Sequence, residues 1–202
     1  MIHNIVSDLG NVLLRYEPLK FLQNKYDMKK AEKLYKYIFL SQEWLDLDRG
    51  VINYDEAIDI ISGRYPEYHD SIKYLINNWI QLLSPIEGSI ELLESLKEKG
   101  YKIYLLSNWH KQSFEVVYKK YNLLKNFDGM VISSDVYLLK PEPQIFINLC
   151  SKYEIKPEES VFIDDMVLNV DVAKELGFKG IQFFSPEQLK AGLIQLGINN
   201  SI

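Results

Sequence analysis

A short apolar run near the start of the chain ends at an acidic residue, and this stretch decides the fold. Residues 2–11 read IHNIVSDLGN. Isoleucine and valine favour extended backbone, so we expect a buried strand over 2–7. The Asp-Leu-Gly-Asn sequence that follows is typical of a loop. The carboxylate of Asp8 is therefore expected at the carboxyl end of that strand.

The next part of the chain shows helical periodicity. Between about Glu17 and Ser84, apolar residues such as Ala31, Leu34 and Ile38 recur three or four positions apart. We call this segment, residues 17–84, the helical block. Its pattern predicts helices and contains no convincing strand.

After Pro85 the predicted strands and helices alternate. Strands are expected over 102–106, 129–133, 160–163 and 180–184, and helices over 89–99, 111–121, 144–153 and 167–176. Such alternation predicts an α/β fold, in which a parallel sheet has helices on both faces. We expect residues 1–16 and 85–202 to form this core, and the helical block to be a cap inserted after the first strand, over the carboxyl edge of the sheet.

Composition limits the classes of function. The chain has 202 residues and a formal net charge of -5, which disfavours a nucleic-acid partner and suits a small molecule. The apolar runs are far shorter than the roughly 20 residues of a membrane span. A single cysteine, Cys150, forms no internal disulfide, which is consistent with a reducing compartment. We expect a cytoplasmic protein with no membrane partner; the sequence leaves its oligomeric state open.

Polar residues follow four of the predicted strands and loops. They are Asp8 with Gly10 and Asn11, Ser107 with Asn108, Lys140, and Asp164 with Asp165. Because parallel strands end at one edge of a sheet, these residues are expected to meet in a single crevice. Two or three carboxylates suit Mg²⁺, and a lysine suits a phosphate group. Ser107 and Asn108 would donate hydrogen bonds to phosphoryl oxygens, and Asp8 would attack phosphorus.

The same clusters carry a resemblance to a known family. Residues 5–13 read IVSDLGNVL, 104–108 YLLSN, 140–143 KPEP, and 161–165 VFIDD, with Asn169 beyond. In order and spacing they resemble the motifs of haloacid-dehalogenase-superfamily phosphatases that have a helical cap after the first strand. The resemblance implies a Rossmann-like core, Mg²⁺ and hydrolysis of a small phosphorylated metabolite.

The resemblance also implies roles for individual residues. Asp8 would be the nucleophile and a metal ligand, and the Gly10 carbonyl and Asp165 would be further ligands. Asp164 would act on the metal through water or by orienting Lys140.

One position departs from the family's pattern. Most phosphatases of the superfamily carry an aspartate two residues after the nucleophile as general acid and base, whereas this chain has Gly10. The Asp-Leu-Gly-Asn-Val form resembles a branch that includes bacterial sugar-phosphate phosphatases of the α-glucose-1-phosphate type. Loss of an acid matters least for good leaving groups, so we expect a preference for activated phosphates. A substitute acid can come from the cap or from His110, and the sequence selects neither.

Several other residues are weaker candidates. Cys150 is interpreted as a small core residue, and the dispersed His3, His69 and His110 do not predict a histidine metal site. The aromatic residues Tyr16, Trp44, Tyr54 and Trp79 are expected mostly in the core of the cap, with one or two touching substrate. Arg15, Tyr16 and Glu17 are interpreted as specificity or hinge residues.

Two alternatives to the phosphatase hypothesis stay open. A 2-haloacid dehalogenase would use Asp8 to attack carbon and would want no metal, and the adjacent Asp164 and Asp165 argue against it. A catalytically weak binding or regulatory protein would have kept the fold without the acid at Gly10. The presence of Asp8, Lys140 and Asp165 together weakens that second hypothesis.

Overall fold

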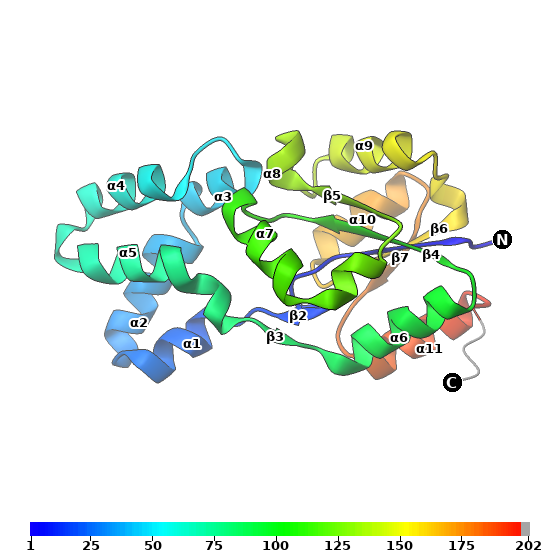
Figure 1. Ribbon diagram of the computed structural model, residues 1–202, viewed down its shortest axis with the longest axis horizontal. Coiled ribbons are helices and arrows are strands. Elements are labelled where there is room, and N and C mark those ends of the chain that lie inside the picture. Colours follow the sequence, from blue (N-terminus) through cyan, green and yellow to red (C-terminus); the bar gives the residue numbers. More distant parts are fainter. Residues whose placement is uncertain (199–202) are drawn as a thin grey trace.

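The core is a five-stranded parallel sheet. The computed structural model describes residues 1–198, and Figure 1 shows their arrangement. The strand order is β5-β4-β1-β6-β7. The strands are β1 (Asn4–Ser7), β4 (Lys102–Ser107), β5 (Gly129–Ile132), β6 (Ser160–Asp164) and β7 (Lys179–Gln182). Every pair of neighbours in this sheet is parallel, as the alternating pattern predicts.

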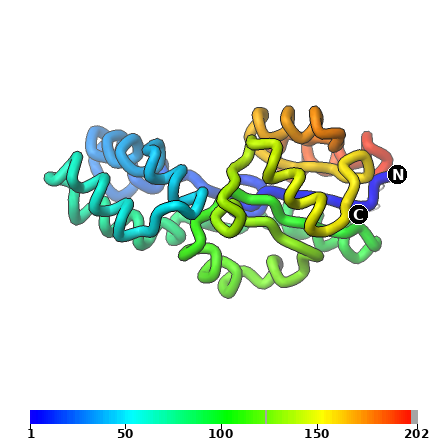
Figure 2. The backbone as a smooth tube through the Cα atoms, turned by 90° about the horizontal axis from the view of Figure 1, so that it is seen from above, coloured from blue at the N-terminus to red at the C-terminus, as the bar shows by residue number. Residues whose placement is uncertain are grey.

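Helices cover both faces of the sheet. They are α6 (Glu87–Glu98), α7 (Lys111–Lys120), α8 (Ser133–Val136), α9 (Pro143–Tyr153), α10 (Val167–Glu175) and α11 (Pro186–Gln195). Successive strand residues point to opposite faces, so Ile5 packs in one apolar cluster with α6 and α11, and Val6 in another with α9 and α10. Figure 2 shows the two helical layers. The α/β, Rossmann-like prediction is confirmed.

The helical block extends beyond the carboxyl edge of the sheet (Figure 1). Its elements are α1 (Pro18–Lys25), α2 (Met28–Leu34), a π-helix (Tyr35–Phe39), α3 (Gln42–Arg49), α4 (Tyr54–Arg64) and α5 (His69–Asn78), with short 3₁₀ turns at Pro66–Tyr68 and Trp79–Leu82. Capping residues start several of them: Ser41 accepts from Trp44 N, and Asn53 forms a capping box with Glu56. Apolar residues of the block and of the sheet form one continuous cluster.

A small antiparallel ribbon joins the block to the core. Strand β2 (Leu14–Arg15) pairs with β3 (Ser84–Pro85), so both connections between the two parts run side by side. The sequence pattern predicted no strand in the block, and at Ser84 that prediction was wrong. A strand of two residues is too short to show an alternation of apolar and polar side chains, so the sequence pattern revealed neither β2 nor β3.

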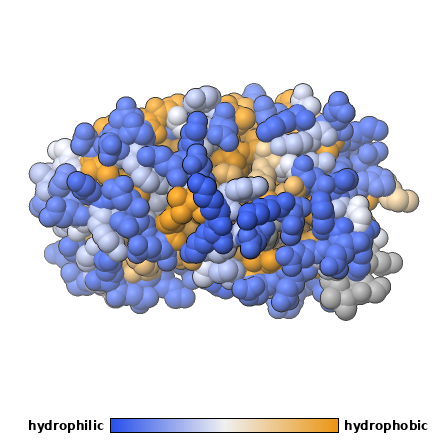
Figure 3. Space-filling model, in the orientation of Figure 1, coloured by the Kyte–Doolittle hydropathy of each residue, from blue (hydrophilic) through white to orange (hydrophobic). Residues whose placement is uncertain are grey.

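The sequence also gave no prediction for the last helix, α11, which Ser185 caps by accepting from Gln188 N. The other predicted strands and core helices lie within a few residues of their observed bounds. None of the helices within residues 1–198 is long and apolar enough to cross a membrane. The face of the molecule seen in Figure 3 is largely hydrophilic, with apolar patches scattered among the polar side chains.

Candidate active site

The predicted site residues lie at the carboxyl ends of the three central strands. Asp8 follows β1, Ser107 ends β4 and Asp164 ends β6, with Asp165 next in the chain. The register pairs Ser7 with Leu105 on one side and with Ile163 on the other, so these strand ends are adjacent. Lys140 arrives on the loop between α8 and α9. The structure thus brings together the charged residues that the sequence singled out.

A buried ion-pair network links three of these residues. The Nζ atom of Lys140 lies 2.8 Å from Oδ1 of Asp8 and 2.6 Å from Oδ2 of Asp164. The hydroxyl of Ser107 donates a hydrogen bond to Asp8 Oδ1 at 2.8 Å. Burial strengthens these interactions because little water competes for the charges. The network holds the Asp8 carboxylate in one orientation.

Burial and crowding shift the acidity of this network. Burial raises the pKa of Asp8 to about 7; Lys140 opposes this shift, and Asp164 and Asp165 add to it. Burial alone would lower the pKa of Lys140, but Asp164 and Asp8 outweigh it, and its pKa rises. Lys140 therefore does not fully offset the cost of burying the Asp8 carboxylate beside Asp164 and Asp165. A further cation beside them would favour the ionised form of Asp8.

Asp164 and Asp165 have different surroundings. Oδ1 of Asp164 accepts hydrogen bonds from Met166 N and Asn169 Nδ2, both at 2.9 Å, while its Oδ2 faces Lys140. Both of its oxygens are thus engaged by the protein. Asp165 accepts one side-chain hydrogen bond, from Asn11 Nδ2 at 3.1 Å, and burial raises its pKa. Of the two, Asp165 has the freer carboxylate.

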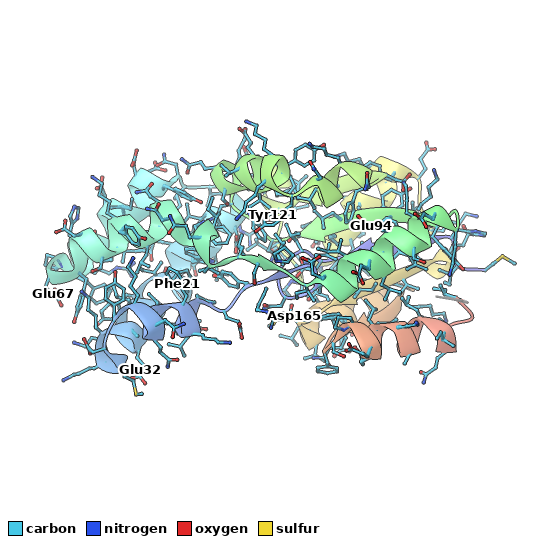
Figure 4. The ribbon with its side chains drawn as sticks, turned by 60° about the horizontal axis from the view of Figure 1, so that its bottom comes forward. Phe21, Glu32, Glu67, Glu94, Tyr121 and Asp165 are labelled. Carbon is cyan, nitrogen blue, oxygen red and sulfur yellow. The ribbon has the colours of Figure 1, made fainter. Side chains whose placement is uncertain are left out.

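The donor set suits a hard divalent cation. Asp8, Asp164 and Asp165 each offer a carboxylate oxygen, and these atoms lie within 4.8 Å of one another. Gly10 lines the same cavity and brings a backbone carbonyl to the loop after Asp8. Oxygen ligands in small number are what Mg²⁺ takes in proteins. Figure 4 places Asp165 where the core faces the helical block.

Asn108 is engaged with the lysine loop. Its Nδ2 donates to the carbonyl of Lys140 at 3.0 Å, and its Oδ1 accepts from the Lys140 amide at 2.8 Å. This reciprocal pair fixes the backbone that carries Lys140. The Asn108 side chain therefore positions the lysine, a role that its place after a strand did not reveal.

A cavity of about 260 Å³ opens beside Asp8. The core wall carries the charged residues described above. The opposite wall is aromatic: Trp79 packs edge-on against Tyr16 and Trp44, with ring centroids 5.8 and 5.5 Å apart, and all three line the cavity. Tyr54 lies behind, where its hydroxyl accepts from Trp79 Nε1 at 2.8 Å. Arg15 and Glu17 line a separate depression.

The helical block adds one carboxylate that the sequence analysis did not single out. Asp48, at the end of α3, lines the cavity with 16% of its side chain exposed. Its Oδ1 lies 3.2 Å from Nε2 of His110. His110 itself is buried behind the cavity wall, and burial lowers its pKa to about 3. An amphipathic helix carries many acidic residues, so no sequence signal distinguished Asp48.

The remaining candidates lie away from this chemistry. Cys150 is half-buried beside an apolar cluster, and burial raises the pKa of its thiol to about 11. Such a thiol is a poor nucleophile, in keeping with its interpretation as a core residue. Within residues 1–198, no histidine belongs to a metal-binding group.

Known proteins resemble this chain in sequence and in fold. A Bacteroides thetaiotaomicron HAD family enzyme, solved in complex with magnesium and inorganic phosphate, superimposes with a TM-score of 0.72 and is 27% identical; the match covers 92% of this chain and 96% of the other. D-ribitol-5-phosphate phosphatase of the same species is 26% identical over 90% of this chain and 92% of its own.

Other relatives have different printed activities. (S)-2-haloacid dehalogenase 4A of Burkholderia cepacia is 26% identical over 63% of this chain and 56% of its own. Drimenol cyclase drtB of Aspergillus calidoustus is 23% identical over 97% of this chain, which spans only 37% of that longer protein. Residues 19–183 match the family described as haloacid dehalogenase-like hydrolase. The chain is therefore a member of the haloacid dehalogenase-like hydrolase family.

Proposed function

We propose that this protein is a Mg²⁺-dependent phosphatase that hydrolyses a small phosphorylated metabolite, a sugar phosphate, through an aspartyl-phosphate on Asp8. The observation that carries the proposal is the contact of one Asp8 oxygen with both Lys140 and Ser107 at a cavity lined by a second carboxylate, Asp165. A carboxylate held in this way can attack an electrophile without first reorienting.

Each core residue has a part in that reaction. Asp8 attacks phosphorus, and Lys140 balances negative charge on the phosphoryl oxygens. Ser107 and Asn108 line the same cavity as Asp8 and would border the phosphoryl group. Asp8, Asp165 and the carbonyl of Gly10 would hold the Mg²⁺. Asp164, whose oxygens are engaged by protein donors, would orient Lys140 and meet the metal through water. When bound, the metal supplies positive charge beside the transferred group.

The helical block is proposed to act as a cap, residues 17–84, over a core of residues 1–16 and 85–202. Its aromatic side chains close one side of a cavity large enough for a small metabolite. A flat aromatic face packs well against the apolar face of a sugar. The names of relatives that act on ribitol 5-phosphate and on phosphorylated carbohydrates support this substrate class. A reducing, cytoplasmic location is consistent with a single cysteine.

The experiment that tests the function is phosphate release from a panel of sugar phosphates and an aryl phosphate. Each substrate is assayed with Mg²⁺, with chelator, and with Asp8→Asn as the matched inactive control. Release that requires both Mg²⁺ and Asp8 is the expected result. Release that is unchanged by chelator or by Asp8→Asn would contradict the proposal.

Two other results would redirect the assignment. Halide release from a 2-haloacid without metal would make the protein a dehalogenase, the activity printed for one relative. Binding of a phosphate mimic with no turnover on any substrate would make it a binding protein. The carboxylates of Asp164 and Asp165 beside Asp8 favour the metal-dependent reaction, because an anionic substrate would otherwise meet three like charges.

A further inference from the structure

Asp48 has no part in the phosphoryl transfer described so far, yet it lines the same cavity as Asp8. It is carried by α3 of the helical block, whereas Asp8 and Asp165, the other carboxylates that line the cavity, belong to the core. Hydrolysis of an alkyl phosphate needs a proton for the departing oxygen. A carboxyl group that lines the same cavity as the nucleophile is suited to deliver it.

The other ionisable side chains of the cavity are unsuited to this step. They are Asp8, Tyr16, Lys140 and Asp165. Asp8 is the proposed nucleophile and Asp165 a proposed metal ligand. Lys140 is occupied by its ion pairs with Asp8 and Asp164. Burial raises the pKa of Tyr16 well above its ordinary value, so its phenol releases a proton poorly. Elimination leaves Asp48.

The position of Asp48 is fixed by contacts with the core. The hydroxyl of Ser133 donates a hydrogen bond to the backbone carbonyl of Asp48. The next residue, Arg49, forms an ion pair with Glu142. Gly50 then adopts a φ of +80°, and a Cβ there would lie 2.5 Å from the carbonyl oxygen of Ser134. This close approach requires glycine, and it seats the end of α3 against α8.

The surroundings of Asp48 keep its carboxyl group protonated. Burial raises its pKa to about 8, with Asp8 adding to the shift and Lys140 opposing it. The facing imidazole of His110 is neutral because burial lowers its pKa to about 3. His110 therefore offers no positive charge that would draw the proton from Asp48. Tyr16 and Tyr54, the other ionisable neighbours, are neutral phenols whose pKa values burial raises.

We propose that Asp48 is the general acid and base of the reaction; this inference rests on the proposed phosphatase function. In the first step an Asp8 oxygen bonds to phosphorus, the bond from phosphorus to the leaving oxygen breaks, and the Asp48 proton passes to that oxygen. In the second step the Asp48 carboxylate takes a proton from water as the water oxygen bonds to phosphorus. The bond between phosphorus and Asp8 then breaks, which releases phosphate and leaves Asp8 as a carboxylate and Asp48 as a protonated carboxyl group.

The test compares two leaving groups in Asp48→Asn. D-Ribitol 5-phosphate leaves as an alkoxide and needs a proton, whereas p-nitrophenyl phosphate leaves without one. We expect kcat for the alkyl substrate to fall roughly 10²- to 10⁴-fold. With the aryl substrate, formation of the phosphoenzyme needs no proton from Asp48 and should keep its wild-type rate, whereas hydrolysis of the phosphoenzyme should be slower. Nitrophenol should therefore appear in a rapid burst, followed by slow turnover.

Two further variants separate catalysis from folding. Asp46→Asn removes a carboxylate from the same helix, one that accepts from Gln42 at 2.9 Å, and is expected to leave both substrates unaffected. Gly10→Asp added to Asp48→Asn places a new carboxyl on the other side of the cavity. A Cβ at Gly10 would meet nothing within 4 Å, so the position has room. We expect this double variant to regain at least tenfold of the lost alkyl-phosphate turnover.

Three results would overturn the proposal. Equal loss of the aryl burst and of alkyl turnover in Asp48→Asn would indicate a structural role. A rise in KM with kcat unchanged would indicate substrate binding alone. No phosphate release by the wild-type protein from either substrate would remove the phosphatase function, and this inference with it; that failure is distinguishable because Asp8→Asn and the wild type would then behave alike.

Discussion

The two walls of the cavity are built from different interactions. The core wall is held by charge: Asp8, Lys140 and Asp164 are buried and paired within 2.8 Å. The wall from the helical block is held by aromatic packing around Trp44 and Trp79, and Asp48 stands in it beside the neutral imidazole of His110. In the proposed mechanism, transfer of the phosphoryl group would therefore depend on the fixed charges of the core, and delivery of the proton on how the helical block docks against the core.

Loss of Lys140 is expected to have the largest effect. Lys140→Met leaves Asp8 and Asp164 buried without a cation, which should lower the free energy of unfolding by about 3–5 kcal/mol. Phosphate release should fall by roughly 10²-fold or more, because charge stabilisation of the transition state is lost. Denaturant titration and steady-state assays measure the two effects. Lys111→Met, at an exposed position that starts α7, is the control and should change neither.

The pH dependence of stability should distinguish Asp48 from its neighbour His110 by sign. The folded-state pKa of His110, about 3, lies below its ordinary value of 6.5, so unfolding takes up a proton between these values. The titration of His110 therefore leaves the free energy of unfolding of the wild type unchanged above pH 6.5 and lowers it as pH falls toward 3. The folded-state pKa of Asp48, about 8, lies above its ordinary value of 3.8. The stability that protonated Asp48 contributes to the folded protein is therefore fully present below pH 3.8, and it is lost as pH rises toward 8.

Denaturant titrations across pH test this contrast in His110→Asn and Asp48→Asn. Relative to the wild type, His110→Asn should gain stability as pH falls below 6.5, and Asp48→Asn should gain stability as pH rises above 3.8. Each slope should approach about 1.4 kcal/mol per pH unit. Slopes of the same sign for the two variants would contradict the assigned protonation states.

Mg²⁺ should act on the core wall only. Binding to the carboxylates of the core is expected to stabilise the folded protein by about 2.7 kcal/mol at a hundredfold excess over Kd. Thermal unfolding with Mg²⁺ and with chelator measures this shift. Asp165→Asn should abolish it and Asp48→Asn should keep it. A shift that survives Asp165→Asn would place the metal elsewhere.

The smallest expected effect comes from loss of the ion pair that holds the helical block against the core. Arg49→Ala removes the ion pair with Glu142, which is about one-third exposed and so worth at most about 1 kcal/mol of stability. Misplacing Asp48 should nevertheless lower turnover of an alkyl phosphate about tenfold. The matched control is Arg64→Ala, which breaks an ion pair with Glu43 inside the block and should leave turnover unaffected. Equal turnover in both variants would show that the contact with Glu142 does not matter.

The same contrast explains what the sequence could predict. Asp8, Ser107 and Asp164 each stand at the end of a strand, and parallel strands bring such ends together, so the meeting of these three residues could be predicted from the alternation of strands and helices. The opposite wall depends on how the helical block docks. Periodicity identifies the buried face of a helix but not the part of the protein against which that face packs. It therefore could not select Asp48 among the acidic residues of α3.

Smaller features escaped the sequence for related reasons. The reciprocal hydrogen bonds between Asn108 and the Lys140 backbone link two loops far apart in the chain. Asn11 joins Asp165 to the backbone of Tyr16 in the same manner. Such contacts depend on tertiary placement of loops, for which local sequence patterns have no equivalent.

The most direct test of the central claim is to trap the phosphoenzyme. The protein is mixed with substrate and Mg²⁺, quenched in acid during turnover, digested, and analysed by mass spectrometry. The account predicts one added phosphoryl group on the peptide that contains Asp8, and none in Asp8→Asn. Continued phosphate release by Asp8→Asn, or a phosphoryl group found on any other residue, would contradict it.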